Sequence, residues 1–112
     1  MIKFNTAFVV FALCLTGQAS AVGVKGDAAA GKSKATACAA CHGADGNKTL
    51  DNTYPKLAGQ YPDYLLKALK EYKSGKRNNA IMAGQVQGLS DADMANLAVY
   101  YGSLKGQMGV LK

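Results

Sequence analysis

Two cysteines and a histidine form the most chemically informative group in the chain. Cys38 and Cys41 are separated by two alanines and followed at once by His42, the only histidine in the sequence. Thiols at this spacing can each add to a vinyl group of one porphyrin, and the imidazole that follows can bind the porphyrin's iron. The pattern therefore predicts covalent attachment of one c-type haem, with His42 as an axial ligand of the iron.

Three other kinds of site use similar residues. A thioredoxin-like Cys-X-X-Cys pair needs the context of a βαβ unit, and no apolar strand precedes Cys38. A structural zinc site needs four ligands, and beyond these three residues the exported chain offers only carboxylates. A simple disulfide between Cys38 and Cys41 gives no reason for a histidine at the next position. Covalent haem is therefore the favoured interpretation.

The N-terminal segment, residues 1–21, has the parts of an export signal. Lys3 supplies a positive charge, residues 7–15 form an apolar run too short to span a bilayer with its flanks, and residues 19–21 match the small-X-small cleavage pattern. We expect export to the periplasm with removal of this segment, including Cys14. A retained N-terminal anchor helix is the alternative.

The expected mature chain, residues 22–112, is long enough for one small domain. A domain of this size commonly needs a cofactor to complete its core, and haem would fill that role. Twelve lysines and arginines against seven acidic residues leave it at about +5 before the haem propionates. This excess suits docking to acidic protein surfaces, whereas nucleic acid is excluded by export. We expect a monomer with no membrane span.

Three helices are predicted in the mature chain. The first starts at Asp27, a good N-cap, and runs into Cys38 with mostly small residues, which allow another helix to approach closely. Residues 62–74 form the clearest amphipathic pattern, with a proline at the first helical position and a glycine after the last. The final helix follows Ser90, which forms a capping-box-like pair with Asp93.

The second axial ligand must come from elsewhere, because no second histidine exists. Methionine sulfur is the natural candidate, since a soft thioether favours ferrous iron. Met94 falls on the buried stripe of the final helix, and Met108 lies near a terminus where ordering a ligand is costly. Met82 lies in residues 77–85, which are expected to form an irregular loop that can bring its sulfur to the iron. An open or water-bound position is the alternative.

Three blocks of the sequence resemble class I cytochromes c, of the small periplasmic bacterial kind also found as each half of dihaem relatives. They are residues 38–43 (CAACHG), 54–60 (YPKLAGQ) and 81–84 (IMAG). The resemblance covers essentially the whole mature chain. It implies an all-α fold in which the N- and C-terminal helices cross and enclose one haem together with a middle helix and loops. The residues expected at the crossing are Ala30, Gly31, Tyr100 and Tyr101.

The resemblance also implies roles for single residues. The carbonyl of Pro55 would accept a hydrogen bond from the imidazole of His42, which would orient the ring and make its other nitrogen a better ligand. Leu57 would pack against the haem on the histidine side. Met82 matches the family's ligand position shortly before the last helix.

The function implied is that of a soluble electron carrier, not an enzyme. It would pass single electrons between respiratory or other redox proteins by outer-sphere transfer, because two filled axial positions leave no place for a substrate. Lysines around the haem edge would steer the partner. The alternatives are a haem subunit of a larger oxidoreductase complex and a haem-based ligand sensor. The candidate steering residues are Lys48, Lys56, Lys73, Lys76 and Arg77.

Overall fold

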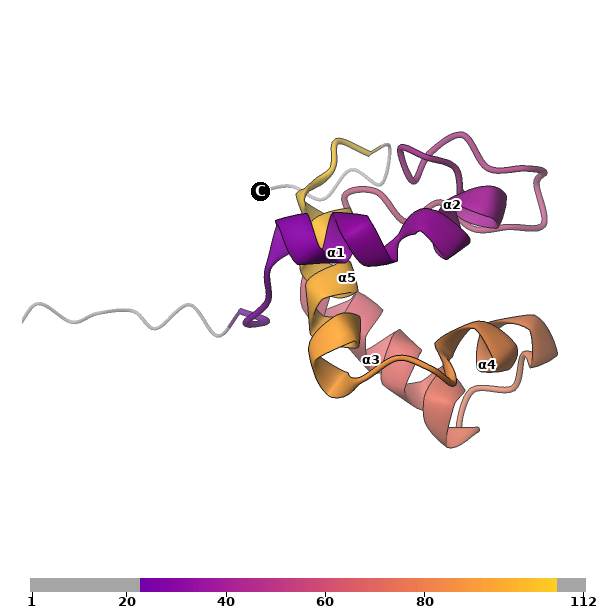
Figure 1. Ribbon diagram of the computed structural model, residues 1–112. Helices are drawn as coiled ribbons and strands as arrows, with labels where there is room; N and C mark the ends of the chain where they lie inside the picture. Colours follow the sequence, from indigo (N-terminus) through magenta and orange to yellow (C-terminus); the bar gives the residue numbers. More distant parts are fainter. Residues whose placement is uncertain (1–22, 107–112) are drawn as a thin grey trace, which may run out of the picture.

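The computed structural model describes residues 23–106, and all regular secondary structure in this range is helical (Figure 1). The expected signal segment with Cys14, and the candidate ligand Met108, lie outside the described residues. No helix within residues 23–106 has the length and apolar character needed to cross a membrane. The helices are α1 (Ala28–Lys34), α2 (Thr36–His42), α3 (Pro62–Ser74), α4 (Ala80–Val86) and α5 (Asp91–Ser103).

The N-terminal helix is divided into α1 and α2. Asp27 caps α1 as predicted, because its carboxylate accepts hydrogen bonds from two backbone N–H groups of the first turn. The prediction of one helix into Cys38 was wrong, since Ala35 interrupts it with a ψ of −5°. The Ala35 N–H is shared between the carbonyls of Gly31 and Lys32, at 2.9 and 3.2 Å, which tightens the turn locally. A second helical segment then includes the whole cysteine–histidine motif.

Helix α1 crosses α5, as expected for the N- and C-terminal helices (Figure 1). A Cβ added at Gly31 would lie 2.1 Å from the carbonyl oxygen of Asn96 and 2.7 Å from the Cβ of Tyr100. The backbones can therefore approach only because this position is glycine. The side chain of Asn96 also accepts a hydrogen bond from the Asp27 N–H at 2.8 Å. Of the residues expected at this crossing, the approach of Gly31 to Tyr100 is confirmed.

Helix α3 has the predicted bounds, with Pro62 in its first turn and Gly75 as a left-handed C-cap at φ +80°. It packs on α5, and its Leu65 joins the main core cluster. The other buried members of this cluster come from the N-terminal segment and α5, so the core lies where α3, α5 and the α1–α2 turn meet. They are Ala35, Leu97, Ala98 and Tyr101.

Helix α5 begins with the predicted capping box. The Ser90 hydroxyl accepts from the Asp93 N–H, and the Asp93 carboxylate accepts from the Ser90 N–H, both at 3.0 Å. Met94 is only 1% exposed and follows the cap by one turn, so its assignment to the buried stripe of this helix is confirmed.

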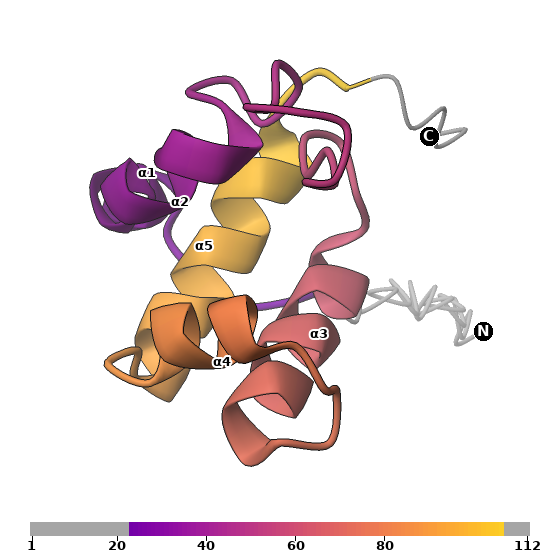
Figure 2. The same cartoon turned by 90° about the vertical axis from the view of Figure 1, so that its right-hand side faces the viewer.

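Helix α4 corrects the expectation of an irregular loop at residues 77–85. The Asn79 side chain accepts from the Met82 N–H at 3.0 Å and starts a seven-residue helix that ends at Val86. A helix this short gives too few turns for hydrophobic periodicity to be visible in the sequence. It packs against α3. Helices α2 and α4 lie on the same side of α5, toward its opposite ends (Figures 1 and 2).

Candidate functional site

Helix α2 carries the three residues of the motif within its last two turns. Cys38 and Cys41 are three positions apart and therefore share one side of the helix. Both are free thiols and partly exposed. His42, the last residue of the helix, is 6% exposed. Two accessible thiols thus lie beside a buried imidazole on a single rigid element.

The imidazole of His42 is held by the main chain of Pro55. Its Nδ1 lies 2.7 Å from the Pro55 carbonyl oxygen, so the hydrogen bond expected between these residues is present. A carbonyl only accepts, so Nδ1 carries the proton and Nε2 keeps its lone pair. The ring of Tyr54 lies edge-on to the imidazole, with centroids 6.4 Å apart and planes at 73°. The ring is therefore oriented with the nitrogen that could bind a metal left unused.

The segment after α2 folds back to bring Pro55 to this position. Gly43 ends the helix directly after the histidine at φ +87°, a conformation that favours glycine. The Leu50 N–H donates to the Cys41 carbonyl at 2.9 Å. The Gly46 carbonyl accepts from the Leu57 N–H at 2.8 Å, which closes the loop around the residues that contact the histidine. Main-chain hydrogen bonds thus determine the path of this loop.

Cys38 contacts the core through Tyr101, a neighbour that sequence reasoning did not find. Burial raises the pKa of the Cys38 thiol, which packs against the core cluster containing Tyr101, and burial likewise raises the pKa of the Tyr101 hydroxyl. The helical period of α5 indicated that Tyr101 is buried, but its partner on α2 could come only from the tertiary structure. The first cysteine is therefore packed on α5.

The remaining predicted site residues lie on other elements. Leu57 is partly buried and packs against the main core cluster. Met82 is partly buried in the first turn of α4. The structure thus groups Cys38, Cys41, His42 and Pro55, and places Met82 on a separate helix on the same side of α5 (Figures 1 and 2).

The donor set of this site fits a covalently attached iron porphyrin. Both thiols are free for thioether bonds, and the imidazole presents Nε2 while its Nδ1 is occupied by a carbonyl. An imidazole held in this way already has the tautomer that leaves Nε2 able to bind iron. The sequence and the geometry of α2 therefore point to the same cofactor.

Comparisons with known proteins agree with this assignment. The family model described as Cytochrome c matches residues 28–105. Cytochrome c4 of Pseudomonas aeruginosa is 49% identical over 102 residues, which cover 91% of this chain and 49% of the relative. Cytochrome c-554(548) of Halomonas halodenitrificans is 49% identical over 81 residues, which cover 70% of this chain and 96% of the relative. The chain thus spans about half the length of the cytochrome c4 relative.

The fold is also similar to a solved structure. The crystal structure of reduced recombinant cytochrome c4 from Pseudomonas stutzeri matches with a TM-score of 0.69 and 43% sequence identity, covering 73% of this chain and 47% of that chain. The all-helical class I cytochrome fold implied by the sequence is confirmed by this similarity and by the α1–α5 crossing. The chain therefore belongs to the cytochrome c family, and its cofactor is covalently attached haem c.

Proposed function

We propose that this cytochrome c is a one-electron carrier in which Cys38 and Cys41 form the thioether bonds and His42 and Met82 are the axial ligands. When bound, the haem supplies an iron that alternates between its ferrous and ferric states. The single observation that carries the proposal is the hydrogen bond of 2.7 Å from His42 Nδ1 to the Pro55 carbonyl. It leaves Nε2 free, fixes the ring and increases its strength as a ligand.

Met82 is proposed as the second ligand because the other methionine of the described residues has a different role. Met94 is 1% exposed and packs in the core, so its sulfur cannot reach a separate site without removing that packing. Met82 is only partly buried, and its backbone is fixed by the side chain of Asn79. Leu57 is proposed as the apolar contact of the haem on the histidine side, next to the core that it joins.

Two protein ligands on the iron favour electron transfer over substrate chemistry. With both axial positions filled by side chains, no site remains for a substrate, and we propose that the protein is not itself an enzyme. The imidazole is held by Pro55 and Met82 lies on a helix, so both ligands can keep their positions in the two oxidation states. Little rearrangement is then needed when an electron enters or leaves.

The proposed setting is the periplasm, with export directed by residues 1–21 and a monomeric mature chain of residues 22–112. Acidic redox proteins are the proposed partners, because the chain is basic, with a sequence pI of about 9.3. Electrostatic attraction would raise the rate of encounter rather than fix one complex.

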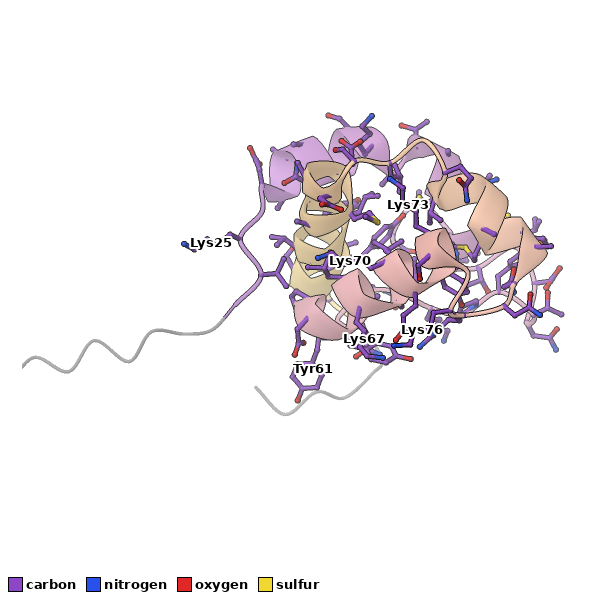
Figure 3. All side chains as sticks on the ribbon, turned by 90° about the horizontal axis from the view of Figure 1, so that it is seen from below. Lys25, Tyr61, Lys67, Lys70, Lys73 and Lys76 are labelled. Carbon is purple, nitrogen blue, oxygen red and sulfur yellow. The ribbon has the colours of Figure 1, made fainter. Side chains whose placement is uncertain are left out.

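The lysines of one face are suited to this docking. Figure 3 shows this basic face from below, with α3 nearest the viewer. Lys67 pairs with Glu71, and the Lys73 ammonium donates to the Leu89 carbonyl. Within residues 23–106, Lys70 and Lys76 have no carboxylate partner within 4.0 Å. We define the basic face as the exposed lysines of α3 and of the residues directly after it, which are Lys67, Lys70, Lys73 and Lys76.

Substitution of two methionines tests the ligand assignment. In the haem-loaded ferric protein, we expect Met82→Ala to abolish the weak near-red charge-transfer band of methionine ligation and to lower the reduction potential. Met94→Ala is the matched control, which should keep the band and lose about 2–5 kcal/mol of stability, because it leaves a cavity in the core. The measurements are absorption spectra, voltammetry and denaturant unfolding of both variants. Loss of the band in Met94→Ala alone would overturn the assignment.

A further inference from the structure

Arg77 is fixed on α3 by both its side chain and its main chain. Its guanidinium carbon lies 5.7 Å from the ring centroid of Tyr64 and 5.4 Å from that of Tyr72, within the range of cation–π contacts. Its Nε is 3.4 Å from a carboxylate oxygen of Glu71. Its backbone N–H donates to the Glu71 carbonyl at 3.1 Å. The short connection from α3 to α4 is therefore attached to α3 at Arg77.

Helix α4 depends on such attachments for its position. It has seven residues, of which only Val86 is fully buried, while Ile81 is 58% exposed. A helix this short is not stable alone in water, so its place is set by its packing on α3, by the burial of Val86 and by what holds its two ends. At the C-terminal side, the Lys73 ammonium donates to the carbonyl of Leu89. At the N-terminal side, the fixed residue is Arg77.

The link from Arg77 to Met82 is short. Arg77 precedes the N-cap Asn79 by two residues, and the Asn79 side chain accepts from the Met82 N–H at 3.0 Å. A displacement of Arg77 therefore moves the cap, and the cap holds the backbone of Met82. The contacts of Arg77 with both tyrosines and Glu71 also mean that its charge is already engaged within α3 and its connection. It is a poor candidate for steering a partner, in contrast to Lys70 and Lys76.

We propose that Arg77, held between Tyr64 and Tyr72, is a positioning residue that keeps α4 in place so that Met82 stays bound to the iron. This inference rests on the proposed role of Met82 as an axial ligand. Arg77 itself touches neither the cofactor nor the ligand and acts through the position of α4. The variants that test it should make the methionine easier to displace while the rest of the fold stays intact.

Imidazole is a suitable probe, because it can occupy the iron of the haem-loaded ferric protein only when the methionine sulfur has left. We expect Arg77→Gln to increase the apparent affinity for imidazole about tenfold, which corresponds to the loss of one or two exposed cation–π contacts. In the Arg77→Gln protein, the near-red band should also disappear at a lower temperature than the helical circular dichroism signal. Lys76→Gln is the matched control: it removes the same charge from the neighbouring residue and should leave both readouts unchanged.

Two substitutions of Tyr64 separate its ring from its hydroxyl. Tyr64→Phe keeps the ring and should have little effect, because the hydroxyl is 3.4 Å from the guanidinium nitrogens and such long hydrogen bonds are weak. Tyr64→Leu removes the ring and should show part of the Arg77→Gln effect. Combining Tyr64→Leu with Arg77→Gln should add nothing, because the contact is already lost. Additive effects of the two substitutions on imidazole affinity would overturn the proposed contact.

The Met82→Ala background distinguishes failure of this inference from failure of the ligand assignment. If Met82 is the ligand, the Met82→Ala protein lacks the band and binds imidazole with high affinity, and Arg77→Gln adds no further increase. A Met82→Ala protein that retains the band would overturn the ligand assignment itself. If Met82→Ala loses the band while neither Arg77→Gln nor the milder Arg77→Lys changes imidazole binding in the wild-type background, the ligand assignment stands and only the positioning role is wrong. If Arg77→Gln raised the imidazole affinity equally in the wild-type and Met82→Ala backgrounds, its effect would be a general loss of rigidity, and the positioning role would also be wrong.

Discussion

At the scale of single residues, the contact of Pro55 with His42 uses a main-chain atom. The imidazole donates to the Pro55 carbonyl oxygen, a group that every residue possesses. The proline ring contributes a fixed φ to the loop but is not itself the acceptor. The hydrogen bond should therefore survive replacement of the side chain, provided that the loop keeps its path.

Pro55→Ala should consequently retain the near-red band and change the reduction potential little, while the free energy of unfolding falls by about 0.4–1 kcal/mol through a more flexible unfolded chain. Pro62→Ala is the matched control, because Pro62 is the other proline and lies at the start of α3, away from the histidine. Voltammetry and denaturant unfolding compare the two. A large fall in potential for Pro55→Ala alone would show that the proline ring, and not only its carbonyl, positions His42.

How far single residues could be predicted depends on how local their chemistry is. Cys38, Cys41 and His42 are adjacent in sequence, so their spacing alone indicated haem attachment. Arg77 was one of five candidates for steering a partner, and its contact with a tyrosine thirteen positions earlier could not be predicted, because it depends on the chain reversing after α3. Such a contact leaves no periodic signal in the sequence. Asn79 is a signal of another kind, because an asparagine before a run of helix formers marks the start of a helix.

At the scale of elements, long helices were predicted well and short ones were not. The helix predicted at residues 62–74 has the observed ends, because its apolar stripe, its first-turn proline and the glycine after its last residue all indicate the same bounds. The break at Ala35 falls inside a run of small residues in which no residue type marks an interruption. Helix α4 is too short to show a period. Local sequence signals were therefore sufficient to predict a helix and its ends only where several of them coincided.

The crossing of α1 and α5 gives a prediction for Gly31. A Cβ there would lie 2.1 Å from the Asn96 carbonyl oxygen, a main-chain atom that cannot move away without displacing α5. Gly31→Ala should force the helices apart and lower the free energy of unfolding by about 1–3 kcal/mol. This loss exceeds the stability that alanine gains over glycine through its higher helix propensity. Gly88→Ala is the control, because nothing lies within 4 Å of the added Cβ. It should change stability little or raise it, and equal losses for both variants in denaturant unfolding would contradict the close approach.

At the scale of the whole molecule, the positive charge of the chain should determine how electron transfer responds to salt. The chain has thirteen lysines and arginines against seven acidic residues. A negatively charged oxidant is attracted to such a surface and a positively charged one is repelled, and both effects are screened over about 8–10 Å at physiological salt. The direction of the salt effect therefore reports the charge that the oxidant meets where the electron leaves.

We expect oxidation of the ferrous protein by ferricyanide to slow as salt is raised, because screening weakens an attraction. Oxidation by the cationic tris(phenanthroline)cobalt(III) complex should accelerate, because screening weakens a repulsion. Stopped-flow kinetics over a range of salt concentrations measures both slopes. If the basic face lies near the electron's exit, Lys70→Gln flattens both slopes more than the control Lys32→Gln on α1, which removes the same charge elsewhere. Equal slopes for these two variants would show that the electron does not leave near the basic face. Reversed slopes in the wild type would contradict attraction to acidic partners.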